Sequence, residues 1–186
     1  MQSVRFIGTN SPLNDIQTAT IQECKAYCES KTVLGVDTET EGFDFTCKKL
    51  IMFQIGDKER QYVIDTRVID ISPLRDILES DKIIKVLHNA KFDYKFIKKW
   101  AGISLEEIYD TFLVERVLHC GKQDHGYSLA RCTERYLNQV LDKETRNKFI
   151  GLKGQPYTVD QITYGANDVV YLLDIRQKQL ALLRNF

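Results

Sequence analysis

Apolar runs of strand length recur along the first two thirds of the chain, and the residues between them are mostly polar. Several runs are almost continuously apolar, which is typical of strands that are buried on both faces of a sheet. The strands predicted in this way are Val4–Ile7, Val33–Asp37, Leu50–Ile55, Gln61–Asp65, Ile83–Leu87 and Ile108–Asp110. Gly56-Asp57 provides the turn of an antiparallel hairpin between the third and fourth of them.

A helical period of apolar residues marks the remaining segments and dominates the C-terminal half. The predicted helices are Asn14–Ser30, Ser72–Glu79, Ala90–Trp100, Thr111–His119, Ser128–Asn138, Asp142–Phe149 and a long C-terminal helix that Thr158 and Gln161 open as a capping box. Strands come first, strand and helix then alternate, and helices follow. This order predicts an α/β fold with a mixed sheet, and residues 1–186 show no internal linker, so we expect one domain.

Composition is that of an ordinary globular protein, with 28% charged and 43% hydrophobic residues. Lys+Arg and Asp+Glu both number 26, so the formal net charge is zero. Basic residues nevertheless gather in two segments, and each of them taken alone is explained as solvated surface. These residues are Lys91, Lys95, Lys98 and Lys99, and Lys143, Arg146, Lys148 and Lys153.

The cysteines and the hydropathy indicate an intracellular protein. Five cysteines without a C-x-x-C pair do not form a disulfide framework and fit a reducing, cytoplasmic location. The spacing of His119, Cys120, His125 and Cys132 matches no common zinc motif. No apolar run reaches membrane-spanning length and no signal peptide is recognisable, so we expect no membrane association.

Asp37 and Glu39 stand two residues apart at the end of a predicted strand, where their side chains point to the same face. Two neighbouring carboxylates repel each other, and bound divalent cations would relieve the repulsion. The alternative is a turn with two solvated acids.

Three further residues place a carboxylate or a phenol beside apolar segments, where such a side chain requires a structural or functional explanation. Asp93 lies in the first turn of a helix that Asn89 can cap, and it could be only a helix-start acid. Tyr164 and Asp168 are four residues apart on one face of the last helix. An aspartate entering that packed region needs a partner such as a metal, while the tyrosine could be ordinary core.

The joint order of these motifs resembles the DEDD superfamily of 3′→5′ exonucleases, in its tyrosine-containing branch. The branch includes ribonuclease D, Werner-type exonucleases and the proofreading domain of family A DNA polymerases. The motifs are D-x-E at residues 37–39, N-x-x-F-D at 89–93 and Y-x-x-x-D at 164–168, and the likeness extends over roughly Val33 to Leu173. The resemblance implies a ribonuclease H-like, three-layer fold with a mixed, mostly five-stranded sheet flanked by helices.

The resemblance also implies a site for two divalent cations, Mg²⁺ or Mn²⁺. By similarity, Asp37 would bridge both ions, Glu39 and Asp168 would complete the site that activates water, and Asp93 would act mainly through water around the second ion. Tyr164 would orient the attacking water, because a phenol with a pKa near 10 is a poor base at neutral pH. These five residues are the predicted catalytic set.

The same resemblance predicts contacts to the 3′ end of single-stranded DNA or RNA, with DNA somewhat favoured. Thr40, Phe43 and Asn89 would bind substrate, Phe43 by stacking on the terminal base. Phe43 could instead be a core residue after a turn, and Asn89 could only cap its helix. Asp110 matches another acid that the family carries, and we interpret it as a supporting or helix-capping residue.

Family members often carry further domains, whereas Asp168 lies 18 residues before Phe186. This suggests a free-standing exonuclease that serves a separate DNA polymerase in trans, and weak, salt-sensitive binding without such a partner. A competing hypothesis is a non-catalytic module of the same fold that only binds nucleic acid. A nucleotide-binding Rossmann domain is disfavoured, because no G-x-G-x-x-G follows the first strand.

Overall fold

A mixed sheet forms the centre of the protein, as a computed structural model shows for residues 3–9, 16–122, 126–141, 149, 152 and 154–184. Its strands are β1 (Ser3–Ile7), β2 (Gln17–Thr18), β3 (Val33–Thr40), β4 (Leu50–Gly56), β5 (Arg60–Asp65), β6 (Ile84–Leu87) and β7 (Ile108–Asp110). Their order is β2-β1-β5-β4-β3-β6-β7. β4 is antiparallel to β3 and β5, and the other neighbours are parallel. The predicted mixed sheet is confirmed, and two short edge strands extend it to seven.

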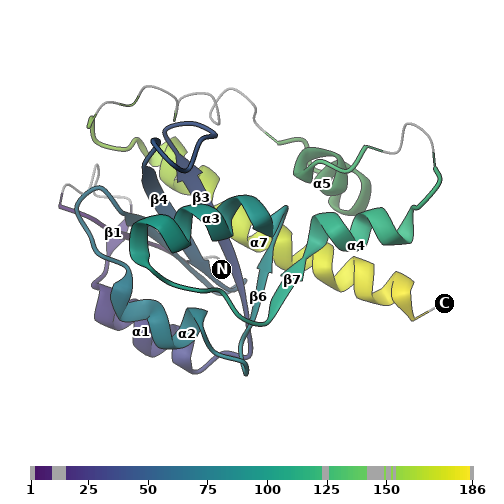
Figure 1. The fold of residues 1–186 in the computed structure, drawn as a ribbon, viewed down its shortest axis with the longest axis horizontal. Coiled ribbons are helices and arrows are strands. Elements are labelled where there is room, and N and C mark those ends of the chain that lie inside the picture. Colours follow the sequence, from purple (N-terminus) through teal and green to yellow (C-terminus); the bar gives the residue numbers. More distant parts are fainter. Residues whose placement is uncertain are drawn as a thin grey trace.

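Helices cover both faces of this sheet and give the predicted three layers, with α3 in front of it and α7 behind it (Figure 1). The helices of the described residues are α1 (Ile21–Glu29), the 3₁₀ turn η1 (Ser72–Leu74), α2 (Arg75–Leu78), α3 (Ala90–Ala101), α4 (Thr111–Leu118), α5 (Leu129–Leu137) and α7 (Val159–Leu183). None of these helices combines the length and the apolar character needed to cross a lipid bilayer.

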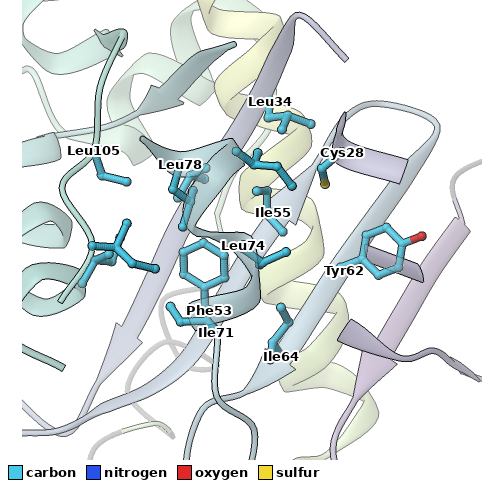
Figure 2. Packing of buried hydrophobic residues seen from close by; sticks show 14 of the residues in the cluster. Cys28, Leu34, Phe53, Ile55, Tyr62, Ile64, Ile71, Leu74, Leu78 and Leu105 are labelled. Atoms are coloured by element: carbon cyan, nitrogen blue, oxygen red, sulfur yellow. The ribbon is translucent and has the colours of Figure 1, made fainter. Parts of the chain in front are cut away.

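Clusters of buried apolar residues lie on both faces of the sheet and hold the layers together. The larger cluster joins the sheet to α1, η1, α2 and α3, and part of it is drawn in Figure 2. Leu34, Phe53 and Ile55 contribute from the strands, and Leu74 and Leu78 come from η1 and α2. The second cluster packs α7 on the opposite face, with Met52, Val63, Ile162 and Ala166 among its members. Met52 and Phe53, two successive residues of β4, thus serve opposite faces, as the strand period requires.

Two predicted helices differ from the structure. The helix predicted over Asn14–Ser30 begins only at Ile21, because Thr20 and Glu23 form a capping box there. Gln17 and Thr18 pair with β1 as a strand instead, and Asn14 and Asp15 lie outside the described residues.

The helix predicted over Ser72–Glu79 is a 3₁₀ turn followed by a single α-helical turn. Ser72 does not cap it, because its hydroxyl donates to Asp70. The helix predicted over Asp142–Phe149 lies almost wholly outside the described residues.

Candidate active site

Three of the four predicted metal ligands converge at the carboxyl-terminal end of β3. Asp37 and Glu39 of β3 and Asp168 of α7 each offer a carboxylate oxygen, and these oxygens lie within 4.8 Å of one another. Asp168 is only 3% exposed, whereas Asp37 and Glu39 are partly buried. Three carboxylate oxygens gathered this closely are the donor set that a hard divalent cation such as Mg²⁺ prefers. The residues therefore fit the metal site that the resemblance implies.

A close approach of α7 to β3 brings the third carboxylate to the strand. A Cβ atom placed on Gly35 would lie 2.6 Å from the backbone oxygen of Val169. One placed on Gly165 would lie 2.6 Å from Nε2 of Gln54, the residue paired with Asp37 across the sheet. Glycine at these two positions thus permits α7 to lie against β3 and β4, and Asp168 directly precedes Val169, the point of contact with β3.

Asp93, the fourth predicted ligand, approaches β3 from the other face of the sheet. The hydroxyl of Thr38 donates to Oδ1 of Asp93 at 2.5 Å. Asp93 is 3% exposed, and this burial, together with the nearby charge of Asp37, raises the pKa of its carboxyl well above the usual range. The hydrogen bond from Thr38 acts in the opposite direction. Asp93 thus lies within electrostatic reach of Asp37 but outside the compact group of three oxygens.

The start of α3 is held by Asp110, the last residue of β7. Asn89 adopts a left-handed backbone conformation, with φ 62° and ψ 51°, and its side chain makes no capping hydrogen bond. The backbone N–H groups of Asn89 and Ala90 instead donate to the two carboxylate oxygens of Asp110, both at 2.9 Å. Oδ1 of Asp110 also accepts from the N–H of Phe112 and so caps α4. The prediction that Asn89 caps α3 through its side chain is therefore wrong, and the helix-capping interpretation of Asp110 is confirmed.

Tyr164 lies one turn before Asp168 on α7, as the spacing predicts. Its partly buried ring packs in the cluster behind the sheet, with its centroid 6.1 Å from that of Phe149. Packing and orientation of a water molecule are compatible uses of this side chain, and its catalytic role remains a prediction.

The segment after β3 carries the other predicted substrate contacts. Phe43 is 79% exposed, so the alternative of a core residue is wrong. Its ring centroid lies 6.3 Å from that of Phe92 on α3. The hydroxyl of Thr40 donates to the carbonyl oxygen of Gly42 at 2.7 Å, which gives Thr40 a role in shaping this turn.

Two residues that the sequence interpretation passed over contribute to this arrangement. Thr38 holds Asp93, and Gly35 admits α7. A signal for each was present: alternation along a strand places Thr38 opposite to Asp37, and glycine inside a strand often marks a close backbone approach.

The fold and the acid cluster together are those of a nuclease with a ribonuclease H-like fold. The profile described as 3′-5′ exonuclease matches residues 15–183, and the chain therefore belongs to this 3′-5′ exonuclease family. The predicted family and enzyme class are confirmed.

Relatives within the family include enzymes named for RNA and for DNA. Ribonuclease D of Haemophilus influenzae is 32% identical over 88% of this chain and 41% of its own length. DNA polymerase I of Aquifex aeolicus is 33% identical over 83% of this chain and 25% of its own length. The chain thus spans less than half the length of these relatives. The structure of Escherichia coli ribonuclease D, an exoribonuclease involved in structured RNA processing, is 27% identical, with a TM-score of 0.75 over 89% of this chain and 43% of that one.

Proposed function

We propose that residues 1–186 form a single catalytic domain that removes nucleotides from the 3′ end of single-stranded nucleic acid and releases nucleoside 5′-monophosphates. The observation that carries this proposal is the convergence of Asp37, Glu39 and Asp168 within 4.8 Å, in a chain that belongs to the 3′-5′ exonuclease family. A non-catalytic module would have no need for three carboxylates at this distance, because their mutual repulsion is a cost without a cation.

In this proposal Asp37, Glu39 and Asp168 hold two divalent cations, Mg²⁺ or Mn²⁺, with Asp93 contributing from the opposite face of β3. Bound cations supply charge stabilisation to the phosphoryl group and lower the pKa of the attacking water. Asp37 has neighbours on both faces, Asp168 behind the sheet and Asp93 in front, so it would be placed to help hold both cations.

The other residues of the proposed site bind and orient. Tyr164 directs the attacking water from α7, one turn away from Asp168. Phe43 offers an exposed aromatic face to the terminal base, and stacking of this kind tolerates any base. Asn89, exposed at the start of α3, and Thr40, at the end of β3, contact the terminal nucleotide.

RNA is the proposed substrate, in place of the DNA that the sequence interpretation slightly favoured. Its support is the similarity to ribonuclease D, which covers 88% of the chain in the Haemophilus relative and 89% in the Escherichia coli structure. DNA is the second candidate, favoured by the relative named DNA polymerase I. Proofreading for a separate polymerase belongs to this second candidate, and it predicts faster removal of a mismatched 3′ deoxynucleotide than of a paired one.

Incubation of the chain with matched 5′-labelled RNA and DNA strands in Mg²⁺ or Mn²⁺ tests the function. We expect a ladder of shortened products that EDTA abolishes, with RNA degraded faster. Asp37→Ala should remove the activity, whereas Tyr164→Phe should leave a measurable part of it. Full activity in EDTA, or no shortening of either strand, would contradict the proposal. Titration with Mg²⁺ distinguishes the proposed enzyme, which binds two ions, from a module that only binds nucleic acid and need not bind two ions.

A further inference from the structure

The segment between β3 and β4 lies along the whole length of α3. In Figure 1 this segment forms the loop above α3. Three contacts join the two segments in order along the helix: the rings of Phe43 and Phe92 (centroids 6.3 Å apart), the rings of Phe45 and Phe96 (6.5 Å) and the indole Nε1 of Trp100 with the carbonyl oxygen of Lys48 (2.9 Å). The contacts reach from the first turn of α3 to its last, so loop and helix present one continuous surface.

Six exposed lysines line this surface, and we call them the lysine strip. The members are Lys91, Lys95, Lys98 and Lys99 on α3, and Lys48 and Lys49 on the β3–β4 segment. The spacing of the four helical lysines places them on one face of α3. With 12 residues, the helix is about 18 Å long. A stacked strand that rises about 3.4 Å per nucleotide would place roughly five phosphates alongside it.

The strip concentrates positive charge in a chain whose formal net charge is zero. Within the described residues, none of the six lysines forms an ion pair with a carboxylate. Two of them have neutral neighbours: Lys98 donates to the hydroxyl of Ser104, and the ammonium of Lys95 lies 5.1 Å from the ring centroid of Phe45. Cations gathered without counter-charges repel one another, and a polyanion would relieve this repulsion.

Two acids on the same loop do not neutralise the strip. The carboxylate of Asp44 accepts from the backbone N–H and the hydroxyl of Thr46. That of Glu41 accepts from the backbone N–H of Lys49, not from its ammonium group. Six cations therefore face two acids that are engaged in local turns, and the surface remains positive.

The position of the strip links it to the candidate active site. Lys91 precedes Asp93 by two residues, and the exposed ring of Phe43 lies beside the same turn of α3. Trp100, 44% exposed, stands at the far end of the helix. A strand with its 3′ end at the carboxylates thus finds ammonium groups for its phosphates and an aromatic face at either end of α3.

We propose that the lysine strip binds the sugar–phosphate backbone of the substrate on the 5′ side of the scissile bond. This inference rests on the proposed function and deepens it. The contacts are electrostatic and independent of sequence, so they govern the binding of longer strands and leave the cleavage step unchanged.

The test compares the full chain with the variant Lys95→Gln/Lys98→Gln/Lys99→Gln on two 5′-labelled substrates, a dinucleotide and a 12-mer of the same RNA. Lys91 is kept because it neighbours Asp93. Each phosphate neutralised on a single strand contributes about 0.7 to the salt exponent, so the variant should lower the exponent for the 12-mer by about 2. For the 12-mer, the ratio of kcat/KM of the variant to that of the unmodified chain should therefore be roughly 100-fold lower at 0.1 M salt than at 1 M salt. The rate at saturation and the cleavage of the dinucleotide should not change.

A matched control removes three exposed cations elsewhere, as Lys82→Gln/Lys178→Gln/Arg184→Gln. We expect this control to retain kcat/KM for the 12-mer within about twofold, because its residues lie outside the strip. Three results would contradict the binding role of the lysine strip without contradicting the exonuclease activity. They are an equal loss of kcat/KM in both variants, a loss of kcat/KM on the dinucleotide as well, and an unchanged kcat/KM on the 12-mer. Failure of the unmodified chain on both substrates would instead refute the proposed function on which the strip depends.

Discussion

The two faces of β3 deliver carboxylates to the candidate active site by different means. Behind the sheet, Asp37 and Glu39 meet Asp168 because α7 packs directly on the strand at Gly35. In front of it, Asp93 accepts a hydrogen bond from the hydroxyl of Thr38, and the start of its helix is held by Asp110. The rear face therefore depends on steric fit and the front face on hydrogen bonds. The two faces should fail in different ways when they are altered.

The largest effect should come from Gly35→Ala, which acts on the rear face. The new Cβ would lie 2.6 Å from a backbone atom of α7, and a backbone atom cannot rotate away as the end of a side chain can. We expect a loss of about 3 kcal/mol in the free energy of unfolding, as for overpacked cores. Displacement of Asp168 should lower the exonuclease rate by at least about 100-fold, since small errors of position are costly in catalysis. Urea unfolding and a rate assay measure both effects.

Gly42→Ala is the control for this substitution. A Cβ there would lie 3.3 Å from the Cγ of Lys48, a flexible and exposed side chain. The free energy of unfolding should change by less than about 1 kcal/mol. If Gly35→Ala proved as mild as this control, α7 would not be fixed by its contact with β3.

Asp110→Ala should have the second largest effect, on the front face. Its carboxylate accepts N–H groups from the starts of α3 and α4, and loss of one cap costs about 0.5–2 kcal/mol. We expect a loss of about 2–3 kcal/mol in the free energy of unfolding, and a smaller loss for Asp110→Asn, which keeps one acceptor oxygen. Equal stability of both variants and the unmodified chain would show that Asp110 does not hold the two helices.

Thr38→Val tests the front face without changing the shape of the side chain. It removes the hydroxyl that donates to Asp93, at an expected cost of about 1–2 kcal/mol in stability. The exonuclease rate should fall about tenfold, because Asp93 loses the group that orients it. Thr38→Ser keeps a hydroxyl and should restore most of the rate. A valine variant with the full rate would show that Asp93 is positioned by its helix alone.

The contrast between the two faces of β3 also explains which parts of the candidate site could be predicted from the sequence. Strand period alone brings Asp37 and Glu39 together, and the same period could have placed Thr38 opposite to them. The meeting of Asp37 with Asp168 depends on a contact across 131 positions of the chain, and no local pattern encodes it. Here the resemblance to the exonuclease family supplied what periodicity could not.

Two of the errors had the same physical origin. Gln17 and Thr18 continue a helical pattern, but they pair with β1, a partner that only the tertiary structure reveals. Asn89 is a good capping residue by type, yet the carboxylate of Asp110 on a neighbouring strand takes the N–H groups it would have served. In both cases a distant contact overrode a sound local preference.

Asn89→Gly should have the smallest effect on stability, and it separates binding from structure on the front face. Asn89 has φ 62°, a conformation that glycine adopts without strain, and its side chain does not cap α3. We expect the free energy of unfolding to stay within about 1 kcal/mol of the unmodified value. If the exposed amide contacts the terminal nucleotide, KM should rise while the folded state is unaffected. An unchanged KM in this variant would show that Asn89 does not bind substrate and contributes only the left-handed backbone conformation at the start of α3.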